Sequence, residues 1–154
     1  LRYFNVFGRR QTPNGAYAAL IPKFIGQFLN VETPVINGDG NYSRDFTYID
    51  NVLKMNYLAM TTQNTEAVKQ VYNTAVGDRI TIKQMTETIQ LGLMNYDPKI
   101  QEIDVKFGLI RAGDVPHSQG SIEKAKRMLG YQPTHNFKQG IAASLAWYFK
   151  NLKK

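Results

Sequence analysis

The segment Asn37–Val52 reads NGDGNYSRDFTYIDNV and combines a glycine-rich turn, a short strand and the start of a helix. The strand carries Arg44 followed by Asp45, and Asp50 is placed to cap the helix that comes next. An arginine held between a turn and a helix N-terminus is well suited to binding an anion such as phosphate. The alternative is a surface ion pair between Arg44 and Asp45, which would contribute little.

Length and composition indicate one globular domain. The chain has 154 residues, of which 43% are hydrophobic and 20% are charged, which is enough to build a real core. No apolar run approaches the ~20 residues of a membrane-spanning helix, and no signal-peptide pattern is present. The absence of cysteine excludes disulfides and thiolate metal sites, and the two histidines lack helical spacing, so we expect no metal. A reducing cytoplasm is the default expectation for location.

The positive charge of the chain is concentrated near its end. The net charge is +7, and the segment from His117 onward holds seven basic residues and one acid, a net charge of +6. These charges fall on two amphipathic helices and a Lys-Lys tail, which favours a solvated face. Arginine clusters with interleaved aromatic residues are missing, so we expect no nucleic-acid binding.

The first part of the chain predicts a strand, a helix and a second strand. Residues 1–7 have the pattern of a buried strand that ends at Gly8. Apolar residues recur at helical spacing over 16–30, and Pro22 indicates that this helix begins or kinks there. A short strand over 35–37 leads into the glycine-rich turn.

Further along, helices and single strands alternate. The strand after the turn has Phe46 and Tyr48 on one face. The later patterns predict a helix over 50–61, a strand over 71–76, a helix over 81–94, a strand over 103–107, an irregular stretch over 108–120, and helices over 121–129 and 137–152. This order is typical of an α/β fold, and the strands are so short and few that we expect a small lobe rather than a complete doubly wound sheet.

Helix-capping residues support several of these boundaries. Thr81 with Gln84, and Asn136 with Gln139, have the spacing of capping boxes. Ser121 is placed to cap the helix that ends before a glycine at position 130, a residue suited to a helix C-terminus.

A second candidate binding segment reads RAGDVPHS over 111–118. Arg111 offers a bidentate fork for phosphate, and Asp114 can accept a hydrogen bond from a sugar hydroxyl. The alternative is an exposed Arg-Asp pair in a loop. Asn5, at the end of the first strand, is a third candidate, although it could equally cap backbone groups. Together these residues suggest a ligand that contains a diphosphate.

Other common sites are absent from the sequence. No G-x-G-x-x-G or Walker A pattern occurs, so the chain has no dinucleotide phosphate loop of its own. His117 and Ser118 are adjacent in sequence, and Asp114 lies close by, which does not suit a Ser-His-Asp triad.

Four motifs occur in this order: L-R-Y-F-N-V-F-G, S-R-D-F-T-Y-I-D-N-V, Y-N-T-A-V-G-D and R-x-G-D-V-x-H-S-Q. The resemblance that they carry is to the C-terminal half of an extended short-chain dehydrogenase/reductase, and among the branches it is strongest to the UDP-N-acetylglucosamine 4-epimerases. It implies one substrate-binding lobe over 1–154, with small mixed sheets packed by helices. Residues 1–8 and parts of 50–76 would form the edge of a Rossmann sheet whose N-terminal half is absent.

The resemblance also implies the chemistry of the complete enzyme. NAD would remove a hydride from C4 of a UDP-sugar and return it to the opposite face of the 4-keto intermediate. The family's Tyr-x-x-x-Lys pair supplies the general base. Here Tyr3 is followed four residues later by Phe7, and Tyr17 by Ile21. We therefore expect no catalytic residue in this segment, no activity of the segment alone, and a homodimer for the full-length protein.

The resemblance assigns binding roles to individual positions. These are Tyr3 and Phe4 beside the nicotinamide, Asn5 at the UDP phosphates, Ala19 and Leu20 at the nucleotide sugar, Val35 and Asn37 around the uracil, Arg44 and Arg111 at the phosphates, and Asp114 at the ribose. Ser118 corresponds to a position beside the sugar 2-substituent, where a bulky tyrosine is common in epimerases restricted to UDP-glucose and UDP-galactose. A serine would leave room for an N-acetyl group, with modest selectivity.

Two other functions are compatible with the sequence. One is a related NAD-dependent nucleotide-sugar dehydratase or decarboxylase. The other, from a different class, is a nucleotide-sugar-binding module without catalysis.

Overall fold

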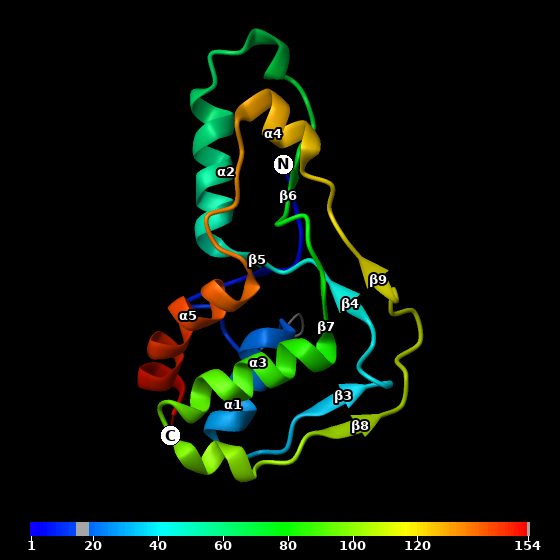
Figure 1. Cartoon of the computed structure of the whole chain (residues 1–154), viewed down its shortest axis with the longest axis vertical. Coiled ribbons are helices and arrows are strands. Elements are labelled where there is room, and N and C mark those ends of the chain that lie inside the picture. Colours follow the sequence, from blue (N-terminus) through cyan, green and yellow to red (C-terminus); the bar gives the residue numbers. More distant parts are fainter. Residues whose placement is uncertain (15–18, 154) are drawn as a thin grey trace.

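The computed structural model describes residues 1–14 and 19–153. Figure 1 shows the arrangement of the helices and short strands. The α-helices are α1 (Leu20–Leu29), α2 (Ile49–Thr61), α3 (Ile82–Met94), α4 (Glu123–Leu129) and α5 (Phe137–Leu152). The 3-10 helices are Thr65–Ala67 and Pro98–Glu102. The strands are β1 (Arg2–Tyr3), β2 (Val6–Phe7), β3 (Val35–Asn37), β4 (Ser43–Arg44), β5 (Thr47–Tyr48), β6 (Asn73–Thr74), β7 (Ile80–Thr81), β8 (Lys106–Gly108) and β9 (His117–Ser118).

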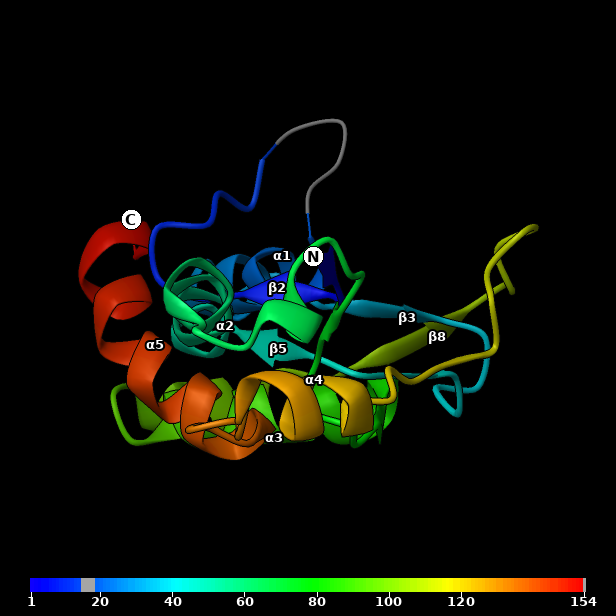
Figure 2. The same ribbon diagram turned by 90° about the horizontal axis from the view of Figure 1, so that it is seen from above.

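The strands form several small sheets, as the sequence predicts. Three parallel pairs join β1 to β6, β2 to β5, and β3 to β8. A three-stranded sheet has β4 at its centre, antiparallel to β7 and parallel to β9. Figure 2 shows β3 and β8 running side by side away from the helices. The strand partners lie far apart in sequence, so long-range contacts hold this lobe together.

Two clusters of buried side chains form the core. The larger cluster joins α1, α3 and α5 to β2 and β5. The centroid of its Phe7 ring lies 5.6 Å from that of Tyr48 and 5.5 Å from that of Phe137. The smaller cluster surrounds Met55 of α2 and includes the fully buried Tyr131. Figure 1 shows α2, α4 and β6 in the upper part of the molecule and α1, α3 and α5 in the lower part. The short strands between these two parts position the candidate site.

The N-terminal strand differs from the prediction. Residues 1–7 do not form one buried strand, because the chain turns at Asn5, whose φ is +33°. The two halves then pair with different partners, β1 with β6 and β2 with β5. The Tyr3 side chain in β1 is 52% exposed, whereas Phe7 in β2 is buried in the core.

The strand after the glycine-rich turn is also split. β4 ends at Arg44 and β5 begins at Thr47, so the two short strands pair with different neighbours. Phe46 and Tyr48 are buried in the larger cluster, as their common face predicts. The prediction that Asp50 caps α2 is wrong. The helix already begins at Ile49, and Asp50 lies in its first turn, where a negative charge is still favourable.

Several boundaries in the second half shift as well. The strand predicted over 71–76 has ladder pairing only at β6. The strand predicted over 103–107 is shifted to β8, because only Lys106–Gly108 pairs with β3. The stretch predicted to be irregular contains β9. Ser121 does not cap α4, which begins at Glu123 after Ile122. Gly130 does end α4, in a left-handed conformation with φ +64°.

The helix signals within the sequence are otherwise confirmed. Both capping boxes are present, at the N-termini of α3 and α5. Helix α1 begins at Leu20, and Pro22 lies in its first turn, where a missing backbone N–H costs little. The beginning of the predicted helix, at 16–18, lies outside the described residues. Among the helices that the structure describes, none has the length and apolar character required to cross a bilayer.

Candidate functional site

A cavity of about 370 Å³ lies between α1, β2, β3, β4 and the loop before β9. Its walls mix apolar and charged side chains. It is lined by Asn5, Val6, Phe7, Ala19, Leu20, Ile21, Lys23, Phe24, Val35, Ile36, Asn37, Tyr42, Arg44, Phe46, Ile82, Arg111 and Asp114. Apolar walls with a few convergent polar groups are typical of a site for a small organic ligand.

Arg44 reaches the cavity from the central strand of the three-stranded sheet. Its Nη1 donates to the carbonyl oxygens of Ser43 at 2.9 Å and Pro116 at 3.2 Å. In the described part of the chain, no carboxylate forms an ion pair within 4.0 Å of Arg44 or of Arg111. The surface ion pairs considered as alternatives are therefore not formed, and both guanidinium groups are available to an anionic ligand.

Asp45 has a different environment from its neighbour. Its side chain is completely buried, and its carboxylate accepts hydrogen bonds from the backbone N–H groups of Val76 (2.9 Å), Gly77 (3.0 Å) and Gly120 (3.2 Å). Burial raises the pKa of Asp45 above its ordinary value, and the three N–H bonds act in the opposite direction. Asp45 thus satisfies backbone groups and does not enter the cavity lining.

The loop that carries Arg111 is joined to Arg44 through strand pairing. β9 pairs with β4, and the backbone N–H of Ser43 donates to the carbonyl of Pro116 at 2.9 Å. Within the loop, the N–H of Asp114 donates to the Arg111 carbonyl at 3.3 Å, in a turn that contains Gly113 at φ +85°. The pairing brings two segments about 70 residues apart in sequence to one cavity.

Most of the positions with expected substrate roles line this cavity. They are Asn5, Ala19, Leu20, Val35, Asn37, Arg44, Arg111 and Asp114. Ser118 is not part of the lining, although it pairs directly with Arg44 in the β4–β9 ladder. The ligand contacts expected for these residues stay predictions.

Several lining residues were not anticipated from the sequence. Lys23 and Phe24 come from the first turns of α1, Tyr42 precedes β4, and Phe46 follows it. For two of them, the sequence spacing from an expected site residue could have predicted a position at the cavity. Lys23 is three residues after Leu20 on the same helix, and Phe46 is two residues after Arg44. Lys23 adds a third cation to the walls.

The residues expected beside the nicotinamide lie away from this cavity. The hydroxyl of Tyr3 donates to Oδ1 of Asn56 at 3.1 Å, and Phe4 packs against the smaller core cluster. Tyr3 in β1 is 52% exposed. The sequence contains no G-x-G-x-x-G pattern for a dinucleotide phosphate loop, and the roles of Tyr3 and Phe4 beside a nicotinamide stay predictions.

Comparison with known proteins agrees with this architecture. Residues 1–75 match the model of the NAD dependent epimerase/dehydratase family. The UDP-N-acetylglucosamine 4-epimerase of Methanobrevibacter ruminantium M1, solved with UDP-N-acetylmuramic acid, is 39% identical with a TM-score of 0.84, over 97% of this chain and 45% of that one. The UDP-glucose 4-epimerase of Thermotoga maritima, solved with UDP-glucose, is 32% identical with a TM-score of 0.85, over 98% and 45%.

A decarboxylase is also similar to this chain. The UDP-N-acetyl-alpha-D-glucosaminuronate decarboxylase of Bacillus cytotoxicus is 26% identical over 151 residues, which are 96% of this chain and 45% of the relative. The chain thus spans less than half the length of the proteins it matches. The order of its motifs, its mixed small sheets and these similarities agree. The chain therefore resembles the C-terminal part of NAD-dependent epimerases/dehydratases, and UDP-sugar 4-epimerases are among the proteins it is similar to.

Proposed function

We propose that this chain is the UDP-sugar-binding half of an NAD-dependent UDP-N-acetylglucosamine/UDP-glucose 4-epimerase. The observation that carries the proposal is the pair Arg44 and Arg111 at one cavity with apolar walls, where neither guanidinium has a carboxylate partner among residues 1–14 and 19–153. A diphosphate can accept hydrogen bonds from two such forks, and the surrounding apolar surface suits a base and a sugar ring. The 4-epimerases similar to this chain support the same reading.

Each lining group has a role in binding and orientation. Arg44 and Arg111 hold the two phosphates, and the Asp114 carboxylate accepts a hydrogen bond from a ribose hydroxyl. Val35 and Asn37, on β3, flank the uracil. Holding the nucleotide in this way fixes the position of the attached sugar, and a well-oriented reactant lowers the entropic part of the barrier.

The epimerisation itself would require groups that these residues do not supply. Inversion at C4 passes through a 4-keto intermediate, and the hydride chemistry belongs to NAD. No Tyr-x-x-x-Lys pair with the expected context is present, so we propose that these 154 residues are inactive alone. We also propose that β1 and β6, which pair in parallel, form the edge of a Rossmann sheet. The homodimeric state stays a prediction.

The proposed substrates are UDP-GlcNAc and UDP-GalNAc, with UDP-glucose and UDP-galactose as further candidates. Ser118 is half-buried and sits beside Arg44 in the ladder. A small side chain at this place leaves room for a 2-acetamido group on the sugar.

Loss of the arginines tests the binding site. Arg44→Ala and Arg111→Ala should each weaken UDP binding by about 1.5–3 kcal/mol, because each removes charge-assisted hydrogen bonds to phosphate. Isothermal titration calorimetry of the intact natural protein measures the change. Arg9→Ala is the matched control, since Arg9 forms an exposed ion pair with Asp50 (3.5 Å) and does not line the cavity. Unchanged affinity in both cavity variants would refute the phosphate role.

Product analysis separates the candidate reactions. The intact protein incubated with UDP-GlcNAc should yield UDP-GalNAc, identified by NMR of the sugar. The similarity to a decarboxylase makes a related reaction the second candidate. Release of carbon dioxide from a UDP-uronic acid, or a 4-keto-6-deoxy product, would replace the epimerase proposal. Binding of UDP-sugars without any turnover would instead indicate a non-catalytic module.

A further inference from the structure

We infer that Asp45 is a positioning residue of the nucleotide site. Through its backbone and its buried carboxylate, Asp45 keeps Arg44, Asn5 and Ser118 in their positions relative to one another. This inference rests on the proposed function. Asp45 does not line the cavity, so it acts through neighbours rather than through contact with the ligand.

The side chain of Asp45 joins two loops to the strand. Its Oδ1 accepts from the N–H of Val76, and its Oδ2 accepts from the N–H groups of Gly77 and Gly120. Gly77 belongs to the turn between β6 and β7, and Gly120 lies between β9 and α4. Gly77 has a φ of +84°, and an added Cβ at Gly120 would lie 2.7 Å from the Cβ of Ala75. The carboxylate therefore sits at the point where these two close-packed turns meet.

The backbone of Asp45 contacts two residues with expected ligand roles. Its N–H donates to the carbonyl of Ser118 at 2.9 Å, and its carbonyl accepts from Nδ2 of Asn5 at 3.0 Å. Asn5 has a positive φ of +33°, an uncommon conformation outside glycine, so this side-chain bond helps to keep the turn between β1 and β2 in place.

Arg44 depends on this arrangement because it directly precedes Asp45. Its guanidinium is oriented by two carbonyl oxygens, one of which belongs to Pro116 in the loop before β9. A shift of Asp45 would move Cα of Arg44 and the β9 pairing together. Catalytic and binding geometry tolerates little displacement, so a small shift should weaken phosphate binding strongly.

The amide Asp45→Asn is nearly isosteric but cannot reproduce the interactions. The carboxylate offers acceptors on both oxygens, whereas the amide has one acceptor oxygen and an NH₂ that would face backbone N–H groups. At least one buried N–H then loses its partner.

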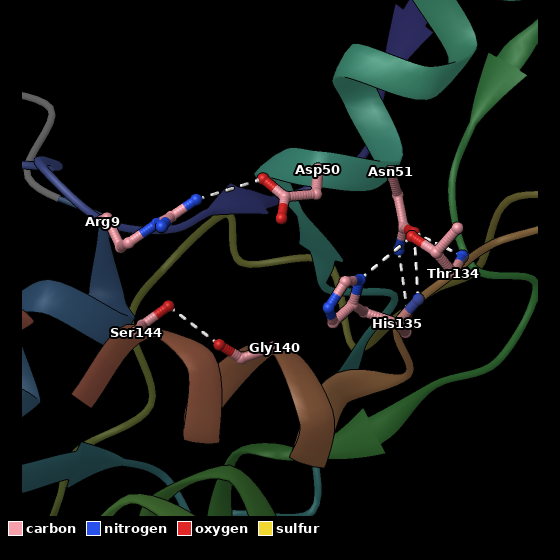
Figure 3. A network of polar contacts seen from close by, with 7 residues as sticks. All are labelled: Arg9, Asp50, Asn51, Thr134, His135, Gly140 and Ser144. Atoms are coloured by element: carbon pink, nitrogen blue, oxygen red, sulfur yellow. Dashed lines mark hydrogen bonds and ion pairs between the residues drawn. The ribbon is translucent and has the colours of Figure 1, made fainter. Parts of the chain in front are cut away.

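Asn51 provides a matched control in the same structure. It is also completely buried, and its side chain makes four hydrogen bonds with Thr134 and His135, at 2.7–3.1 Å. Figure 3 shows this cluster at the first turn of α2, where it joins α2 to the segment before α5. None of these three residues lines the cavity. Asn51→Ala should therefore lower stability without changing the nucleotide site.

The test compares Asp45→Asn and Asn51→Ala in the intact natural protein. UDP affinity is measured by calorimetry at a temperature where thermal unfolding shows both variants folded, and the side-chain amide resonances of Asn5 are followed by NMR without ligand. Asp45→Asn should bind UDP about tenfold or more weakly, with shifted Asn5 resonances. Asn51→Ala should keep wild-type affinity and wild-type Asn5 resonances.

Two results would overturn the inference. One is wild-type UDP affinity in folded Asp45→Asn, and the other is an equal loss of affinity in Asn51→Ala, which would indicate general destabilisation. If the wild-type protein itself fails to bind UDP, the proposed function is wrong. The role of Asp45 is then decided by the Asn5 resonances alone, and unchanged Asn5 resonances in Asp45→Asn would refute it.

Discussion

Arg44 and Asp45 show how adjacent side chains can have opposite roles. The arginine faces the cavity and lacks a carboxylate partner among the described residues, while the aspartate is buried and bound by three backbone N–H groups. A charged residue is stable in such a place only when hydrogen bonds replace its hydration. The same pair would have formed a weak surface ion pair had both side chains been exposed.

Ser118→Tyr tests the expected selectivity. In the intact enzyme the variant should lower activity on N-acetylated UDP-sugars more than on UDP-glucose, because a ring beside the sugar 2-substituent excludes the acetamido group. The selectivity should change by roughly 10–200-fold at most, as expected for a change in pocket size. Steady-state kinetics with both substrates measure the ratio. Equal losses on both would indicate that Ser118 does not determine selectivity.

We predict that the free energy of unfolding falls at alkaline pH because of Tyr131. Burial raises the pKa of Tyr131 from its ordinary 10.0 to about 12, with a smaller contribution from the negative charge of Asp45, and its hydroxyl donates to the Ala75 carbonyl at 2.9 Å. The unfolded chain releases this proton more readily, so its stabilising contribution is complete below about pH 10 and is lost as pH rises through 12. The loss should reach about 2–3 kcal/mol.

Urea unfolding at about pH 9 and pH 11.5 measures this effect, with Tyr131→Phe as the comparison. The variant should lose about 2 kcal/mol less than wild type between these conditions. Burial also raises the pKa of Tyr148, so part of the alkaline loss will persist in the variant. Identical pH dependence in the two proteins would contradict the assignment.

The ends of the helices could be predicted from the sequence more accurately than the ends of the strands. A capping box needs only residues three positions apart, and both predicted boxes are formed. Two-residue strands such as β4 and β9 exist only through partners elsewhere in the chain. Ser121 has the residue type of a cap but lies outside α4, because the chain there still follows the turn that contains Gly120.

Asn136, which caps α5, and Ser121, which does not cap α4, allow a paired test of helix capping. Asn136→Ala should destabilise the protein by about 1 kcal/mol, since the Asn136 side chain accepts from the N–H of Gln139 at 3.0 Å. Ser121→Ala should change the free energy of unfolding by less than about 0.5 kcal/mol. Chemical denaturation of both variants checks the difference. A larger loss for Ser121→Ala would mean that the serine stabilises α4 after all.

The lobe is held together where α5 approaches the strands. A Cβ at Gly140 would lie 2.7 Å from Cζ of Phe7 and 2.8 Å from Cβ of Tyr48, so the helix and the β2–β5 pair meet without space for a methyl group. The hydroxyl of Tyr148, also on α5, donates to the carbonyl of Gly8. Phe7, against which α5 packs at Gly140, also lines the cavity, so α5 stabilises one wall of the site.

Gly140→Ala should therefore destabilise the protein by about 1–3 kcal/mol, although alanine favours a helix more than glycine does. Gly26→Ala in α1 is the control, because its Cβ would lie 3.5 Å from Cβ of Pro13, an ordinary van der Waals contact. The control should lose less, as the helical preference of alanine is not opposed by a steric clash. Thermal unfolding of both variants distinguishes them. Equal melting temperatures would argue against tight α5–strand packing.

Local sequence patterns were sufficient for the helices and for the two arginines of the cavity, and the motif order was sufficient for the resemblance to epimerases. Periodicity, capping pairs and the motifs around Arg44 and Arg111 depend on residues close together in the chain. The break of the first strand at Asn5, the pairing of β9 with β4 and the burial of Asp45 could not be predicted in this way. Asp45 accepts from Gly120, 75 positions further along, and Asn5 donates to the Asp45 carbonyl from 40 positions away. Such contacts exist only after the loops close, because their hydrogen bonds offset the entropy of closure only in the assembled fold.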